Sequence, residues 1–175
     1  MELKMLQTAM NVAYERWQYG NLSGYNQRDF YMNLTDVERA ACLLGNLNYQ
    51  VENGGWAQWW GNGYASASSF WIEGVIEQIG TSAAKKVLLL VRSALLAIDE
   101  HESERQDCNR WGNSLWDEGE DEGPNFPCNN DYYLINSQFM KDAEEWFSAW
   151  SKEKISQSEQ LGEILLLSET DHVTV

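Results

Sequence analysis

The chain has 175 residues, of which 43% are hydrophobic and 13% aromatic, and its 27 acidic and 12 basic residues give a formal net charge of −15. Disordered acidic chains are poor in aromatic residues, so this composition excludes a disordered chain. It favours a single folded domain with a hydrophobic core. The charge repels nucleic acid and anionic membranes, which argues against direct binding to either and leaves basic protein surfaces as the expected partners.

The sequence also indicates the cellular compartment of the protein. It contains no run of about 18 apolar residues that would span a bilayer, and it does not begin with the basic and apolar stretch of a signal peptide. Its three cysteines, Cys42, Cys108 and Cys128, are an odd and sparse set that suits free thiols in a reducing compartment. We therefore expect a cytoplasmic protein, and pairing of Cys108 with Cys128 stays open.

The first helix is predicted over residues 2–19, because apolar residues recur there at spacings of three and four. These residues are Leu3, Leu6, Met10, Ala13 and Trp17. Residues 20–29, which are rich in glycine and asparagine, are predicted to form a loop.

The second helix is predicted to begin at a capping box, in which the Thr35 side chain and Glu38 satisfy each other's free backbone amides. It is predicted to end at Gly54 and Gly55, because glycine readily takes the left-handed conformation that closes a helix. One or two further helical turns are expected over residues 56–60, before the glycines of residues 61–63.

Two more helices follow in the middle of the chain. A helix over residues 67–79 is predicted from the inward residues Phe70, Trp71, Val75, Ile76 and Ile79. Gly80 ends it, and Thr81 or Ser82 caps the next helix, over residues 82–98, which can continue toward Asp107. The inward residues of that helix are Val87, Leu88, Val91, Leu95 and Ile98.

The last third contains a loop and a final helix. Residues 108–131 read as a long acidic loop, and Asn136 or Ser137 caps a helix whose inward residues are Phe139, Ala143, Trp146, Phe147 and Trp150. Residues 1–155 form the predicted domain, an all-α, single-domain helical bundle of about six to eight helices. Residues 156–175 form a tail in which residues 164–167 suggest a last helix that packs on the core or on a second copy.

The acidic surplus begins abruptly. Residues 80–98 carry three basic and no acidic residues, whereas residues 99–131 carry 11 acidic and two basic residues, a net charge of −9. At about 100° and 1.5 Å per residue, the acids from Asp99 to Asp107 would cover about 200° of a helix, at a linear density near the one charge per roughly 3.4 Å of a DNA strand. We expect these carboxylates to mimic phosphates. The candidates are Asp99, Glu100, Glu102, Glu104 and Asp107 on the helix, Asp117, Glu118, Glu120, Asp121 and Glu122 in the loop, and Asp142 and Glu145 on the final helix.

One motif carries a family resemblance. Asn53-Gly54-Gly55-Trp56 is followed by Gln58 and Trp59, after the helix that begins at residue 34 and before Ile79-Gly80 and Asp131-Tyr132-Tyr133. With that context the chain resembles a bacterial family of DNA-mimic proteins, acidic and helical, that was formerly a domain of unknown function. The resemblance covers roughly residues 30–150.

The resemblance implies a dimeric, acidic, helical protein that binds a transcription regulator. The motif itself reads as a fold signature, since two glycines allow a sharp turn and the tryptophans beside them bury a large area. A ligand pocket lined by tryptophan and Gln58 is the alternative. No contact residue carries over from the family by motif matching.

Metal and catalytic sites find little support. The loop acids lack the ligand positions of a calcium loop, and the cysteines and histidines lack paired zinc spacing, so no metal and no cofactor are expected. His101 lies among Glu100 and Glu102, which predicts an exposed, charged histidine rather than a general base. No phosphate loop or hydrolase motif is present, and we expect no enzyme.

The sequence thus predicts a DNA mimic that occupies the nucleic-acid site of a basic DNA-binding protein and blocks it competitively. That partner is a transcription regulator, a nuclease or a restriction complex. From the family resemblance, we expect this protein itself to be a homodimer. Two alternatives stay open. One is an interaction module that uses a tryptophan-rich surface without mimicry, and the other is an enzyme of unrecognised type.

Overall fold

The structure is a computed structural model that describes residues 4–17, 27–110 and 123–170, with side chains described in 4–17, 28–103 and 123–157. Its described residues form helices and no strand, which confirms the all-α prediction. The helices are α1 (Lys4–Arg16), α2 (Gln27–Asn33), α3 (Asp36–Gly61), α4 (Tyr64–Ser68), α5 (Ile72–Ile79), α6 (Ser82–Arg110), α7 (Asn129–Tyr133) and α8 (Asn136–Thr170).

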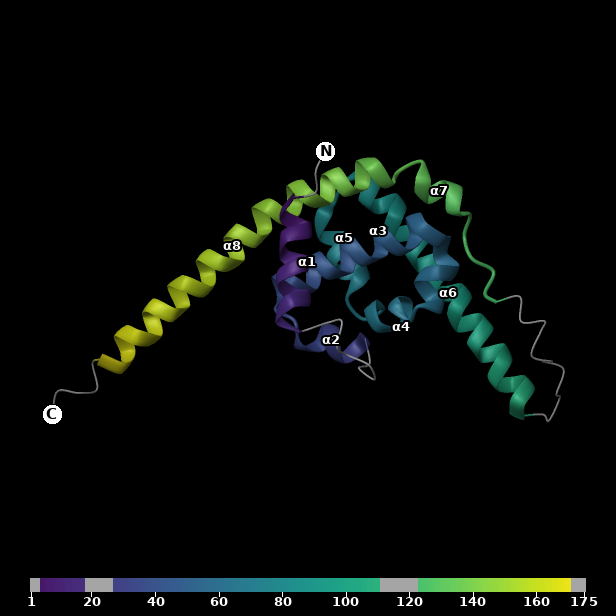
Figure 1. The fold of residues 1–175 in the computed structure, drawn as a ribbon, viewed down its shortest axis with the longest axis horizontal. Helices are drawn as coiled ribbons and strands as arrows, with labels where there is room; N and C mark the ends of the chain where they lie inside the picture. Colours follow the sequence, from purple (N-terminus) through teal and green to yellow (C-terminus); the bar gives the residue numbers. More distant parts are fainter. Residues whose placement is uncertain (1–3, 18–26, 111–122, 171–175) are drawn as a thin grey trace.

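Helix α3 forms the centre of the molecule (Figure 1). It contacts α1, α4, α5, α7 and α8, while α6 packs against α5 and α8. The largest buried side chains of α3, such as Leu44, Leu47 and Trp56, fill the core between these helices. The C-terminal parts of α6 and α8 extend from different sides of this body and diverge (Figure 1). None of the described helices is both long and apolar enough to cross a membrane.

The capping box at the start of α3 is present as predicted. The Glu38 backbone N–H donates to Thr35 Oγ1 at 3.3 Å, and the Thr35 backbone N–H donates to Glu38 Oε2 at 2.9 Å. Arg16 Nη2 of α1 also donates to Glu38 Oε2, at 2.6 Å. The cap therefore fixes α1 to the start of the central helix.

Gly54 and Gly55, where the second helix was predicted to end, leave the helical conformation and form a kink in α3, and the further turns predicted after them follow it. Gly55 has a φ of 70° and a ψ of −170°, and helical turns resume directly after it. The Trp56 backbone N–H, left without a helical partner at the kink, donates to Asn129 Oδ1 at 3.1 Å. The kink turns Trp56 and Trp59 into the core, where their rings meet edge to face.

Two sequence predictions in the N-terminal half were wrong. Helix α2 begins at Gln27, inside the predicted 20–29 loop, because Phe30, Tyr31 and Leu34 form an apolar face that packs into the core. The single helix predicted over residues 67–79 is two helices, α4 and α5. Phe70 lies in the turn between them and is 81% exposed, so its assignment to the inward face was wrong.

Helix α6 follows the prediction closely. Gly80 ends α5 with a left-handed φ of 72°, and Thr81 Oγ1 accepts the Ala84 backbone N–H at 3.2 Å. Val87, Val91 and Ile98 are buried along its inner face. The helix continues to Arg110, which confirms its predicted extension toward Asp107 and makes residues 108–110 helical rather than part of the loop. Within the rest of that predicted loop, residues 111–122 lie outside the described residues and residues 123–128 are not helical. Residues 129–131 belong to α7, so the predicted end of the loop at residue 131 was wrong.

Helix α8 starts at Asn136 and buries Phe139, Ala143 and Phe147, while Trp146 and Trp150 are half-buried. Buried Glu144 accepts the free backbone N–H groups at the start of α1, from Met5 at 2.7 Å and from Leu6 at 3.1 Å. The backbone continues as one helix to Thr170, so residues 156–170 prolong α8. The side chains of residues 164–167 lie outside the described ones.

Candidate interaction surfaces

The first candidate surface is the acidic face of α6, defined here as Asp99, Glu100 and Glu102. All three side chains are exposed. At about 100° per residue they occupy one side of the helix, and the backbone of the same helix carries Glu104 and Asp107. The side chains of Glu104 and Asp107 are not among the described ones.

The opposite side of this helical segment is anchored to the body. Ile98 is buried, and His101 is only 7% exposed. The His101 ring lies edge-on to Trp60 with centroids 5.7 Å apart, and Trp60 also contacts Phe126. The prediction of an exposed His101 was therefore wrong. A sequence signal for the burial of His101 does exist. The residue continues the three- and four-residue spacing of the buried side of α6, which includes Val91, Ala94 and Ile98.

The acids of the acidic face make no ion pair or hydrogen bond with any described side chain, unlike several acids elsewhere. Glu73 and Glu77 of α5 share Arg92 of α6, each at 2.6 Å. The carboxylates of the acidic face are therefore open to a partner's cations.

The remaining predicted acids fall into two groups. Asp117, Glu118, Glu120, Asp121 and Glu122 lie outside the described residues. Asp142 and Glu145 lie on α8, where Asp142 is half-buried and accepts Gln138 Nε2 at 2.6 Å, while Glu145 is exposed. The acidic end of α6 points away from α8, the helix that carries these two acids (Figure 1).

The glycine–tryptophan motif makes internal contacts. Asn53 Nδ2 donates to the Tyr49 carbonyl at 2.7 Å, and Gln58 Nε2 donates to the buried Gln50 at 2.9 Å. Gly55 is buried against the Asn129 side chain, with no room for a Cβ. Trp56 and Trp59 are buried, and the Trp56 ring meets the rings of Trp59 and Tyr132 edge to face. This is the geometry of a turn packed into the core.

Titratable groups offer no evident catalytic or metal centre in the described part of the chain. There, no three His, Cys, Asp or Glu side chains gather closely enough to hold a metal ion. Burial raises the pKa of the Cys42 thiol to about 12, with a further contribution from the nearby Glu38. Cys128 is exposed, and the Cys108 side chain is not described. Cys42 is therefore a buried thiol that stays protonated at neutral pH.

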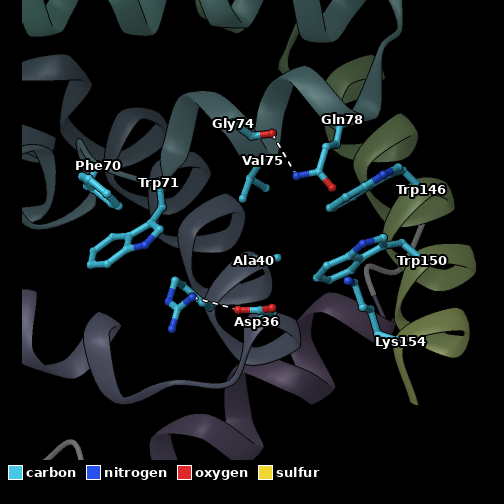
Figure 2. Close-up of a pocket in the computed structure, with 11 residues that line it drawn as sticks. Asp36, Ala40, Phe70, Trp71, Gly74, Val75, Gln78, Trp146, Trp150 and Lys154 are labelled. Carbon is cyan, nitrogen blue, oxygen red and sulfur yellow. Dashed lines mark hydrogen bonds and ion pairs between the residues drawn. The ribbon is translucent and has the colours of Figure 1, made fainter. Parts of the chain in front are cut away.

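The second candidate surface is a cavity of about 350 Å³ between α3, α5 and α8, which we call the tryptophan groove (Figure 2). Trp71 forms one wall, and Trp146 and Trp150 form the other. Ala40 and Val75 lie between the two walls. The charged residues along its edge are Asp36, Arg39 and Lys154.

A third hollow, of about 420 Å³, lies between α1, α3 and α4. Its polar side chains bind one another. The Tyr14 hydroxyl donates to Asn46 Oδ1 at 2.7 Å, and Asn46 Nδ2 donates to the Tyr31 hydroxyl at 2.8 Å. Burial raises the pKa of Tyr31 well above its ordinary value, so this chain of hydrogen bonds stays neutral and joins three helices.

Comparison with known proteins identifies the family. A family model described as DMP19-like protein matches residues 32–153, well over half of the chain and most of the helical body. Comparison with curated proteins and with solved structures gave no match. The chain belongs to the DMP19-like protein family.

Proposed function

We propose that this protein mimics the charge surface of DNA and blocks the nucleic-acid site of a basic DNA-binding protein. Membership of the DMP19-like family supports the proposal, and so does the net charge of −15. The observation that carries it is the acidic face. Asp99, Glu100 and Glu102 are exposed and face solvent from a helix whose other side is held by buried Ile98 and His101.

The order of charges along α6 supports a functional reading of these acids. A helix is stabilised by acids near its N-terminus and by bases near its C-terminus. Helix α6 has Lys85 and no acid in its first turn, while five acids gather in its C-terminal part, where Arg105 and Arg110 are the only bases in the sequence. Helix stability therefore does not explain the acids, and residues that break a local rule are expected at functional sites.

The spacing of the acids fits the phosphates they would replace. Five acids occur from Asp99 to Asp107, and at about 1.5 Å per residue this is one acid for roughly every 3 Å of helix axis. A DNA strand carries one charge per roughly 3.4 Å. Lysine and arginine side chains arranged for a DNA strand would therefore meet carboxylates at a similar linear density.

The mechanism is electrostatic competition. The carboxylates pair with the target's Lys and Arg side chains, and the complex forms fast at low salt and weakens as salt rises. The proposed target is a transcription regulator, a host-defence nuclease or a restriction complex. We further propose that the protein is a homodimer that acts in the cytoplasm and does not catalyse a reaction. Residues 164–167 of α8 are its proposed dimer contact.

The experiment is capture from native lysate on the immobilised protein at low salt. We expect a basic DNA-binding protein to be retained, and to be released by duplex DNA and by about 0.5 M salt. The variant Asp99→Asn/Glu100→Gln/Glu102→Gln should retain less of it. The control variant Glu15→Gln/Asp29→Asn/Asp131→Asn, which removes three exposed acids elsewhere, should retain as much as the unchanged protein.

The comparison of the two variants separates mimicry from general charge, because both change the net charge from −15 to −12. Equal loss in both would mean that only the total charge acts. A partner that DNA and salt both fail to release would contradict the proposal.

The tryptophan groove favours a second candidate function, an interaction module that works without mimicry.

A further inference from the structure

The tryptophan groove is separate from the acidic face and has no role in the proposed mimicry. It lies between α5 and α8 over the first turns of α3, whereas the acidic end of α6 lies on the other side of the body (Figures 1 and 2). The groove is therefore a second surface whose occupant has to be inferred from its own chemistry.

Its walls are aromatic and held in place. Trp146 and Trp150 lie one turn apart on α8 and stack with centroids 5.0 Å apart and ring planes 16° apart. Across the groove, Trp71 lies under the Arg39 guanidinium, 5.3 Å from the ring centroid. Large, rigid aromatic side chains bury much area at a small cost in conformational entropy, which is why they dominate binding surfaces.

Arg39 fixes this wall and is not available to a ligand. Its Nε donates to the Tyr31 carbonyl at 2.8 Å, one Nη donates to the Leu34 carbonyl at 2.6 Å, and the other Nη pairs with Asp36 at 3.0 Å. The guanidinium thus binds groups of its own chain and neutralises Asp36, the one acid among the described residues that line the groove.

Lys154 is the cation that a ligand can reach. Its side chain is exposed, and its ammonium lies 5.9 Å above the Trp150 ring at the edge of the groove (Figure 2). With Asp36 paired to Arg39, the lining carries one uncompensated positive charge, in a chain whose net charge is −15. That charge complements a carboxylate.

The apolar surface continues past the end of the groove. Phe70 lies at one end of the groove, in edge contact with Trp71, and is 81% exposed. Exposed apolar side chains that extend a groove in this way are typical of a site for another protein. Gln78 adds a polar group at the rim, with its Nε2 bound to the Gly74 carbonyl at 3.1 Å and its oxygen left to accept a backbone N–H.

We infer that the tryptophan groove binds a peptide segment of a partner protein in which a Glu or Asp lies beside large apolar side chains. The apolar side chains lie between Trp71 and Trp150, and the carboxylate pairs with Lys154. This occupant differs in charge from the basic target of the acidic face, so one molecule can hold both at once.

The experiment measures fluorescence anisotropy of a peptide that carries fluorescein on its N-terminal amine, fluoresceinyl-Ser-Leu-Phe-Glu-Leu-Phe-Ser-amide, titrated with the full chain. We expect saturable binding, weakened about tenfold by Phe70→Ser or by Lys154→Glu. The matched controls are Met32→Ser, at an apolar side chain that is 58% exposed elsewhere, and Lys152→Glu, on the same helix but about 200° away. Both controls should change the affinity less than twofold.

Two results with the Glu peptide and the two variants would overturn the inference. One is no saturable binding up to about 1 mM protein, or binding that Phe70→Ser and Lys154→Glu leave unchanged. The other is a change of oligomeric state of the full chain in either variant by light scattering, since the groove would then hold a second copy. A peptide with Gln in place of Glu should bind about tenfold more weakly, and equal binding would also contradict the role given to Lys154. Neither variant touches the acidic face, so capture of a DNA-binding protein is tested independently.

Discussion

The His101 imidazole packs edge-on against the Trp60 indole, with ring centroids 5.7 Å apart, and this contact joins the acidic segment of α6 to the kinked end of α3. His101 is buried while its neighbours Glu100 and Glu102 are exposed. A charged segment that would otherwise repel itself is thus attached to the core by one face.

Replacing Trp60 with alanine should loosen the acidic segment. The change removes the contacts with His101 and Phe126, and we expect a loss of about 2–3 kcal/mol in the free energy of unfolding. Hydrogen exchange should show faster exchange of the backbone amides of residues 99–103. Leu96→Ala, at a side chain of α6 that is 58% exposed, serves as the control and should leave those amides protected. Unchanged protection in the Trp60 variant would mean that other contacts hold the segment.

Glu144 and Glu145 should differ sharply in their effect on stability. Glu144 is buried and accepts the Met5 and Leu6 backbone N–H groups, so Glu144→Ala leaves these donors without a partner and should cost about 1–3 kcal/mol. The exposed Glu145 makes no such contact, and Glu145→Ala should change stability by less than about 0.5 kcal/mol. Urea denaturation measures both. Similar values for the two variants would contradict the role of Glu144 as the cap of α1.

Two glycine substitutions should change the free energy of unfolding in opposite directions. Gly55 has a φ of 70°, and a Cβ there would collide with the Asn129 side chain, so Gly55→Ala should destabilise by more than about 1 kcal/mol. Gly74 lies within α5 with open space around it, and Gly74→Ala should stabilise by about 0.5–1 kcal/mol. Thermal or urea unfolding of both variants checks the pair. A neutral Gly55→Ala would show that the kink tolerates a side chain.

Stability should fall steeply at alkaline pH. Burial raises the pKa of Tyr132 well above its ordinary value, with a smaller contribution from Glu52. Above about pH 10 the unfolded chain loses a proton that the folded chain keeps, so each such tyrosine lowers the free energy of unfolding by about 1.4 kcal/mol per pH unit. Below pH 10 this contribution is constant.

The variant Tyr132→Phe tests that origin. It removes one titrating group, so the slope of stability against pH above about pH 10 should decrease by about 1.4 kcal/mol per unit, although the hydrogen bond to Asn48 is lost at every pH. Phe30→Leu, a core substitution without a titrating group, should lower stability equally across the range. An unchanged slope in Tyr132→Phe would assign the alkaline loss to other groups.

Local signals in the sequence predicted the ends of several helices correctly. The Thr35–Glu38 capping box, the left-handed Gly80 and the Thr81 cap act within one turn of chain, and each is found where it was predicted. The buried side of α6 was also predictable, because its apolar residues recur at the helical spacing of three and four. These features depend on neighbouring residues alone.

Features that depend on distant partners could not be predicted this way. The kink at Gly55 is held by Asn129, and the cap of α1 comes from Glu144. Phe70 was assigned to the core because its spacing suits a helix, but the chain turns there between α4 and α5. The tryptophan groove arises only when α5 and α8 are placed on either side of α3, so nothing in the local pattern indicates it.

The most direct measurement of the central claim is competition between this protein and DNA for the captured, purified DNA-binding partner. If the acidic face occupies the partner's nucleic-acid site, rising concentrations of duplex DNA should release the partner completely, and Asp99→Asn/Glu100→Gln/Glu102→Gln should lower the DNA needed for release by about tenfold. The control Glu15→Gln/Asp29→Asn/Asp131→Asn should leave it unchanged. A ternary complex of protein, partner and DNA, formed without loss of affinity, would contradict DNA mimicry.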